Sequence, residues 1–303
     1  MSNLMKPTAA WRRNGLQWQS KIKAYRAMAR ESSGREIHLR IEGTAQRAKL
    51  CKGKSLMENR KSVRYRNPPL IEALCEFGFQ ETGIPSNIIL GKLYEQIEED
   101  FPTIETHRGI DVQAEEDTPS PAIVMEERTR FVSKDGTRLI QVGPGLLVAN
   151  QLKPYKDYPS FRKFIQETMD VYYRVAKPAG LRHIGLRYIN RIEMRQNQLL
   201  EEVFHIGFKI PEEFQSFPDP YLLRMEFAYC EGRDRLIVSF AAAPPQNDSP
   251  NAIMLDFEYI LVKPDEIDDK LLEWMDEAHE KIEDAFHACL TESVLHSFEP
   301  EEM

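Results

Sequence analysis

The sequence predicts an α+β fold made of a tandem pair of related units, each an antiparallel meander sheet with helices on one face. Three observations predict it. Beyond residue 66, both halves of the chain give the same order of segments: a strand, a helical or irregular piece, a run of strands and a helix. The segment 131–140 matches 227–237 with one inserted residue. The helix that ends each half carries apolar side chains along one side, as a helix that covers a sheet does.

The first half begins with a strand at residues 70–80, where apolar and polar side chains alternate. Pro68 and Pro69 precede it, at a position where a missing N–H costs no ladder hydrogen bond. A helix is expected at 87–100, because apolar residues recur at helical spacing, and Ser86 is the expected N-cap. The later segments are a weak acidic strand or loop at 105–121, strands at 123–133, 137–143 and 146–152, and an amphipathic helix at 160–176.

The second half repeats this order. The expected segments are a strand at 181–194, a mixed piece at 199–217, and strands near 221–230, 235–242 and 252–262. A long helix at 265–290 closes the chain, and Trp274 lies in its apolar stripe. We expect Trp274 to anchor this helix on the sheet, and Phe77 and Phe79 to be buried in the first strand.

Basic and acidic residues are distributed unequally along the chain. Residues 1–66 hold 17 Lys and Arg against 4 Asp and Glu, whereas residues 67–303 hold 23 against 44. Residues 1–56 show no sustained apolar period, so a disordered basic extension is expected there. This extension is either a nucleic-acid-binding tail or sequence upstream of a natural start at Met57. The expected domains are a first α+β lobe at 57–178 and a second at 179–303.

Composition and missing motifs exclude several classes of protein. No run approaches the roughly 20 apolar residues that a membrane-spanning helix requires, and no segment near the start suits a signal peptide. The 4 cysteines form no C-x-x-C pair, which argues against a disulfide scaffold or zinc ribbon and favours a reducing, cytoplasmic location. The sequence contains no G-x-G-x-x-G, G-x-x-x-x-G-K-[ST], H-E-x-x-H or G-x-S-x-G motif, so no cofactor is expected.

One pattern in the closing helix has the spacing of a metal site. His279, Glu283 and His287 follow one another at intervals of four residues, which lets three side chains approach one ion. Each of them directly follows a residue of the apolar stripe, as ordinary boundary positions of a helix do. We therefore expect a solvated helix flank and no metal.

Charged residues on two strands form the candidate site. Glu72 and Glu76 share one face of the first strand, roughly 13 Å apart. Arg187 and Arg191 have the same spacing on the strand that opens the second half. If the two halves are related, these pairs occupy equivalent places and meet across the interface. They are then either ion pairs that fix orientation and register, or the charged walls of a cleft.

The candidate cleft for a ligand or partner consists of Glu72, Glu76, Arg187, Tyr188, Asn190 and Arg191, and no catalytic residue is predicted. The strand face that carries His183, Arg187 and Arg191 is expected to lie against water or a ligand. Asp256 and Glu258 form a further acidic strand face, which is expected to be solvated.

Three segments together resemble a known family. They are N-P-P-L-I-E-A-L-C-E-F at 67–77, L-R-Y-I-N-R-I at 186–192 and L-D-F-E at 255–258. The chain resembles, over about residues 60–298, a sporadically distributed bacterial family of uncharacterised proteins whose members begin a few residues before the first segment. That resemblance favours Met57 as the start and implies no activity, cofactor or catalytic residue. Its patchy occurrence suggests an accessory role in mobile-element or phage conflict.

These observations favour a non-enzymatic binding or accessory protein that takes a protein partner or a small ligand. The acidic body argues against direct binding of nucleic acid outside residues 1–56. No membrane association is expected. A metal-dependent hydrolase or nuclease that uses the strand carboxylates is the alternative.

Overall fold

The computed structural model describes residues 63–80, 83–113, 122–207, 213, 221–244, 251–264 and 270–301. The expected basic extension and its start at Met57 lie outside these residues. Parts of the segments expected at 199–217 and 265–290 also lie outside them.

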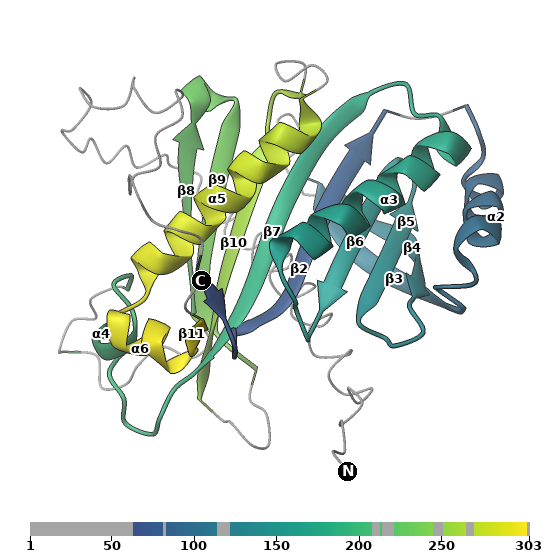
Figure 1. Cartoon of the computed structure of the whole chain (residues 1–303). Helices are drawn as coiled ribbons and strands as arrows, with labels where there is room; N and C mark the ends of the chain where they lie inside the picture. Colours follow the sequence, from purple (N-terminus) through teal and green to yellow (C-terminus); the bar gives the residue numbers. More distant parts are fainter. Residues whose placement is uncertain are drawn as a thin grey trace, which may run out of the picture.

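A single antiparallel sheet of nine strands forms the centre of the described protein (Figure 1). Its order is β3-β4-β5-β6-β2-β7-β10-β9-β8, so both halves of the chain share one extended sheet. The expected α+β class with antiparallel strands is confirmed. The strands are β2 (Leu70–Phe79), β3 (Thr103–Gln113), β4 (Ala122–Val132), β5 (Arg138–Gly143), β6 (Leu146–Leu152), β7 (Leu181–Glu193), β8 (Leu222–Tyr229), β9 (Asp234–Ala242) and β10 (Ala252–Leu261).

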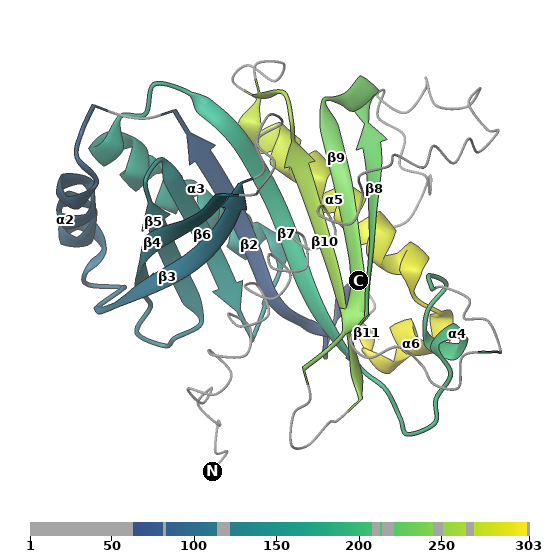
Figure 2. The same cartoon turned by 180° about the vertical axis from the view of Figure 1, so that it is seen from behind.

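The two halves join where β2 pairs with β7 at the middle of the sheet. In this register Ala73 lies opposite Tyr188, and Leu74 lies opposite Arg187. From this pair the sheet extends through β6, β5, β4 and β3 on one side and through β10, β9 and β8 on the other. The β3–β4 end curls away from the helices, toward the viewer in Figure 2.

Two long helices, α3 (Tyr158–Ala176) and α5 (Leu271–Cys289), cover the same face of the sheet (Figure 1). Helix α3 begins at the N-cap Asp157, whose carboxylate accepts a hydrogen bond from the Ser160 N–H at 2.8 Å. The shorter helices are α2 (Ser86–Ile97), which packs on α3, α4 (Leu200–Val203) and α6 (Glu292–Ser297). No helix in the described part of the chain is long and apolar enough to span a membrane.

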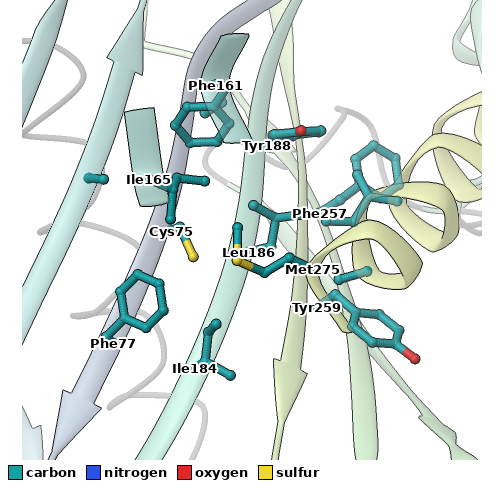
Figure 3. Packing of buried hydrophobic residues seen from close by; sticks show 14 of the residues in the cluster. Cys75, Phe77, Phe161, Ile165, Ile184, Leu186, Tyr188, Phe257, Tyr259 and Met275 are labelled. Atoms are coloured by element: carbon teal, nitrogen blue, oxygen red, sulfur yellow. The ribbon is translucent and has the colours of Figure 1, made fainter. Parts of the chain in front are cut away.

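The core lies between the sheet and these helices (Figure 3). Because side chains alternate along a strand, β2 turns Cys75 and Phe77 toward the helices and the residues between them to the opposite face. Phe77 and Phe79 are fully buried, and Phe79 stacks on Tyr172 of α3 with ring centres 5.0 Å apart. Trp274 is 3% exposed, so its expected burial is confirmed. We call the opposite side of the sheet, turned away from α3 and α5, the polar face.

One expectation for the first half needs correction, and one open alternative is decided. Ser86 is the first residue of α2, and Pro85 is the N-cap; the Pro85 carbonyl accepts the Ile89 N–H at 3.2 Å, and no side chain caps the helix. Of the segment expected as a strand or a loop at 105–121, the described part belongs to a strand, β3, which pairs with β4 along its whole length; residues 114–121 lie outside the described part. Pairing with a neighbour outweighs the weak intrinsic preference of such a segment, since strand propensity depends on context.

The first and last described segments pair with each other. Strands β1 (Arg64–Tyr65) and β11 (Pro300–Glu301) form a separate antiparallel ladder, which the sequence did not predict. The Val63 N–H also donates to Glu283 Oε1 of α5 at 3.1 Å. The described chain therefore begins and ends at the same place.

Replacement of Phe79 by alanine tests the core. We expect Phe79→Ala to lower the free energy of unfolding by about 3–5 kcal/mol, because it removes a buried ring and leaves a cavity. Ile88→Ala is the matched control: Ile88 is 44% exposed, and its loss is expected to cost about 0.5 kcal/mol or less. Urea unfolding followed by circular dichroism measures both, and equal losses would contradict this placement of Phe79.

Candidate functional site

The four charged residues that the sequence singled out lie on the polar face. Glu72 and Glu76 alternate with the core residues of β2, and Arg187 and Arg191 alternate with those of β7. Their exposure differs from the expectation: Glu72, Arg187 and Arg191 are buried, at 5, 7 and 5%. Leu74 and Ile189 lie among them in a small apolar cluster of the same face. A strand face rich in charges is thus not a water-exposed surface here.

Tyr188 and Asn190 lie on the other side of β7, toward the helices. The Tyr188 hydroxyl lies 3.2 Å from the Tyr155 hydroxyl and 3.0 Å from His279 Nδ1. The Asn190 amide donates to the Leu255 carbonyl at 3.2 Å. The six residues of the candidate cleft therefore do not form one site, because β7 divides them between its two faces.

Arg187 forms the strongest ion pair of the polar face, with Asp256 of β10. Its Nε donates to Asp256 Oδ1 at 2.8 Å and its Nη2 to Oδ2 at 2.5 Å, the parallel geometry in which a guanidinium best matches a carboxylate. Asp256 is 2% exposed, so the expectation of a solvated acidic face there is wrong. The ionic partner of Arg187 thus lies on β10, the strand next to β7 in the second half of the sheet.

Glu72 accepts its hydrogen bond from a neutral side chain. Asn150 Nδ2 of β6 donates to Glu72 Oε1 at 2.6 Å, and Gln141 Nε2 of β5 donates to Asn150 Oδ1 at 2.8 Å. Arg130 Nε of β4 in turn donates to Gln141 Oε1 at 3.2 Å. We call these four residues, with Arg187 and Asp256, the polar belt; it crosses β4, β5, β6, β2, β7 and β10 in their order in the sheet.

The charges of the belt are perturbed in different directions. Burial raises the pKa of Glu72, although its bond from Asn150 and the charges of Arg187 and Arg130 favour the ionised form. Burial also opposes the charge of Arg187, but Asp256 outweighs it and raises the pKa of that guanidinium. Arg130 forms no ion pair with a carboxylate of the described residues, and burial lowers its pKa to about 10.

Glu76 lies toward the accessible end of the polar face. Its carboxylate lies 3.3 Å from His183 Nε2 and 3.6 Å from Arg128 Nη1. The side chains of Glu76 and His183 are 34 and 35% exposed, so solvent reaches this end. Gly78 makes room for the imidazole, because a Cβ there would lie 2.1 Å from His183 Cε1.

Arg191 is held near the rim of the polar face. Its Nε donates to Glu193 Oε1 at 2.9 Å, and its Nη1 donates to the Pro244 carbonyl at 3.0 Å. Arg191 is thus paired on its own strand and with the segment that follows β9.

Tyr188 belongs to a second cluster, between α3 and α5. The Tyr158 ring stacks on His279 at 3.8 Å between centres, and the Tyr158 hydroxyl donates to Asp276 Oδ1 at 2.8 Å. Arg162 of α3 makes two hydrogen bonds to the same carboxylate. Burial lowers the pKa of His279 to about 4, so its ring is neutral at pH 7. The cluster fastens the two long helices to each other.

The His279, Glu283 and His287 side chains do not converge on one point. His279 Nδ1 faces Tyr188, and its Nε2 lies 4.0 Å from Glu283 Oε2. His287 Nε2 faces the Tyr65 hydroxyl at 2.9 Å, and its Nδ1 faces the Glu283 carbonyl. The three side chains therefore make separate contacts and do not form a metal-ligand set.

Among the described residues, one group has ligand atoms close enough for a metal: Cys230, Asp234 and Glu277. A cation already lies among them, because Arg233 Nη2 is 2.5 Å from Asp234 Oδ2, 3.4 Å from Glu277 Oε2 and 3.6 Å from Cys230 Sγ. Trp274 Nε1 also donates to Asp234 at 3.1 Å. This geometry is that of an ion-pair cluster around Arg233.

Sequence reasoning missed Arg130, Gln141 and Asn150. Each lies on a strand that the sequence predicted, at a position that alternates with a buried apolar residue. That alternation was a usable signal, since it assigns all three to the face that also holds Glu72. Their mutual contact depends on strand register, which the residue types do not reveal.

No protein-family model matches the chain, and a search of curated proteins gives no match.

Substitution of Glu72 tests the electrostatics of the belt. A raised pKa means that burying this carboxyl costs stability once it ionises, so the wild-type protein loses stability as pH rises from 4.5 through the folded-state pKa. Glu72→Gln keeps an acceptor for Asn150 and has no charge to bury. We expect the variant to gain stability relative to wild type as pH rises, in urea titrations between pH 4 and 8. The exposed Glu95→Gln is the control, and a gain that grows as pH falls would contradict the raised pKa.

Proposed function

We propose that this protein is a non-enzymatic binding protein whose site lies on the polar face, around Glu72 and Arg187. One observation carries the proposal: the polar belt of buried charged and amide groups crosses six strands on a face that neither long helix covers. Burying ions costs several kcal/mol each unless their partners are well placed. Residues that only stabilise the sheet are more simply apolar, so a row of this kind suits recognition of a polar group.

Binding is favoured over catalysis by the state of the carboxylates. Both oxygens of Asp256 accept hydrogen bonds from Arg187, and Glu72 accepts one from Asn150. A general base or a metal ligand needs a carboxylate that is available to the reacting group. The partially exposed Glu76 and His183 offer a route from solvent to this face.

The proposed occupant is a protein partner or a small ligand. Residues 67–303 hold 44 acidic against 23 basic residues, which disfavours approach of a nucleic acid to the body. We propose, on the resemblance to a sporadically distributed bacterial family, that the role is accessory, in mobile-element or phage conflict.

We also propose that the two halves of the sheet are related units. The supporting observation is that two belt pairs occupy corresponding places: Asn150 lies opposite the residue two beyond Glu72, and Asp256 lies opposite the residue two beyond Arg187. The matching segments 131–140 and 227–237 fall on the hairpins β4–β5 and β8–β9. Each hairpin lies directly beside the strand pair of its own half, β2–β6 or β7–β10. On this proposal Glu72 and Arg187 descend from one ancestral position.

The alternative is a hydrolase or nuclease that uses the strand carboxylates. The raised pKa of Glu72 favours it, because a general acid needs a carboxyl that holds its proton more firmly than an ordinary one. A metal-dependent activity that Glu72→Gln or Glu76→Gln removes without unfolding the protein would support this alternative. Activity that survives both substitutions removes the two residues from the mechanism.

The test of the binding proposal is native mass spectrometry of the full chain, tagged at its C-terminus and purified from its own host. We expect a stoichiometric protein or small molecule to travel with it. Affinity for that molecule, once isolated, is then expected to fall about tenfold or more in an Arg187→Ala/Arg191→Ala double variant.

Two further variants keep this test interpretable. Arg187→Ala leaves Asp256 buried without its cation, so Arg191→Gln serves as the milder substitution if the double variant unfolds. Arg182→Gln, at an exposed position of β7, is the control for Arg191→Gln, because it removes one positive charge outside the polar face. If a folded double variant binds the co-purified molecule with unchanged affinity, the assignment of the site is wrong.

A further inference from the structure

Arg130 differs from the other buried arginines of the polar face. It is 3% exposed, and its Nε donates to the neutral amide oxygen of Gln141. Within the described residues, no carboxylate forms an ion pair with it. Arg187 has Asp256 and Arg191 has Glu193 as ionic partners on the same face. The two outer nitrogens of the Arg130 guanidinium therefore lack the partner that the other two arginines have.

Acidic groups near Arg130 do not replace that partner. Burial, the largest influence, and the charge of Arg128 oppose the charge of Arg130, whereas Glu72 and Glu105, which lies opposite it in the register, favour that charge. The net result is a pKa lowered to about 10, in contrast to the raised pKa of Arg187. Because the pKa of Glu72 is itself raised, this carboxyl holds its negative charge less readily. The β4 end of the belt thus holds two guanidinium groups, Arg130 and Arg128, with Glu105 opposite Arg130 in the register and Glu76 at 3.6 Å from Arg128.

Two more nitrogen-bearing side chains lie beside Arg130. Arg128 is two residues away on the same face of β4, and His107 of β3 lies opposite Arg128 in the register. Burial and the charges of Arg130 and Arg128 lower the pKa of His107, which shows that all three groups share one electrostatic environment. The strands that carry this group, β3 and β4, curl toward the polar face (Figure 2).

We propose that Arg130 binds an oxyanion group of the ligand, a carboxylate or a phosphate, through its two outer nitrogens, with Arg128 contributing positive charge. The inference rests on the proposed function, since it names the chemical group that the polar face recognises. A guanidinium that is fixed at Nε presents parallel N–H donors to two oxygens of one anion. Such an anion supplies the ionic partner that no described carboxylate provides for Arg130.

The test uses inorganic phosphate and acetate as probes on the full chain. Melting temperature is measured at constant ionic strength while chloride is replaced by either anion. We expect a saturable rise in wild type, since a ligand that binds the folded state stabilises it. A response to phosphate alone assigns a phosphate ligand, and a response to acetate alone assigns a carboxylate.

Arg130→Gln is the decisive variant, because it keeps an amide that can donate to Gln141 and removes the charge. We expect the apparent affinity for the effective anion to fall about tenfold or more, while the melting temperature in chloride stays at or above that of wild type. Arg130→Lys keeps the charge without the paired donors and is expected to bind with intermediate affinity; it also replaces Arg130→Gln if that variant fails to fold. Arg182→Gln is the control for loss of one positive charge.

Three outcomes would overturn the inference: no saturable response of wild type to either anion, an equal response in Arg130→Gln, or a clearly lower melting point of folded Arg130→Gln in chloride with its anion affinity intact. The same variants distinguish a failure of the oxyanion inference from a failure of the proposed binding function. If the Arg187→Ala/Arg191→Ala variant loses its partner while Arg130→Gln responds to anions as wild type does, the binding site stands and the oxyanion assignment falls.

Discussion

The pairing of β2 with β7 is the contact on which the rest of the structure depends. It joins the first and second halves of the chain in one sheet and fixes their register, with Ala73 opposite Tyr188. Because strand side chains alternate, this one register decides which residues face α3 and α5 and which face away. A shift by one residue would move Phe77 out of the core and Glu72 into it. The apolar core on one side and the polar belt on the other are thus two consequences of the same pairing.

The polar belt shows how a sheet accommodates buried charge. Neighbouring strands satisfy each other in sequence: amides link Arg130 to Glu72, and Arg187 is paired with Asp256. A buried charge is tolerated when the fold holds its hydrogen-bonding partners in position. Removal of one partner leaves the other buried without compensation for the water it has lost. Arg130 departs from this rule, and this departure sets the β4 end of the belt apart.

Much of the fold is readable from the sequence, because alternation and helical spacing are local signals. They located eight strands of the sheet and the two long helices to within a few residues. What they missed has physical causes. The sequence left strand or loop open for the segment of β3, because pairing with β4 stabilises this strand and no local pattern reports that pairing; two-residue strands such as β1 carry no period at all. In the candidate site, charge was taken as a sign of exposure, whereas Arg187 and Asp256 are charged and buried together. Which belt residues touch depends on register across strands far apart in the chain, such as Glu72 and Asn150.

The ladder between β1 and β11 brings Arg64 next to Glu301. The described polypeptide is therefore nearly a closed ring, although it is covalently open. Linking positions so close together costs little conformational entropy, since the loop to be closed is short. A circularly permuted form, with new ends in a turn such as that at Gly145, preserves every strand pairing of the sheet. The contacts that hold the strands together therefore do not depend on the order in which the chain connects them.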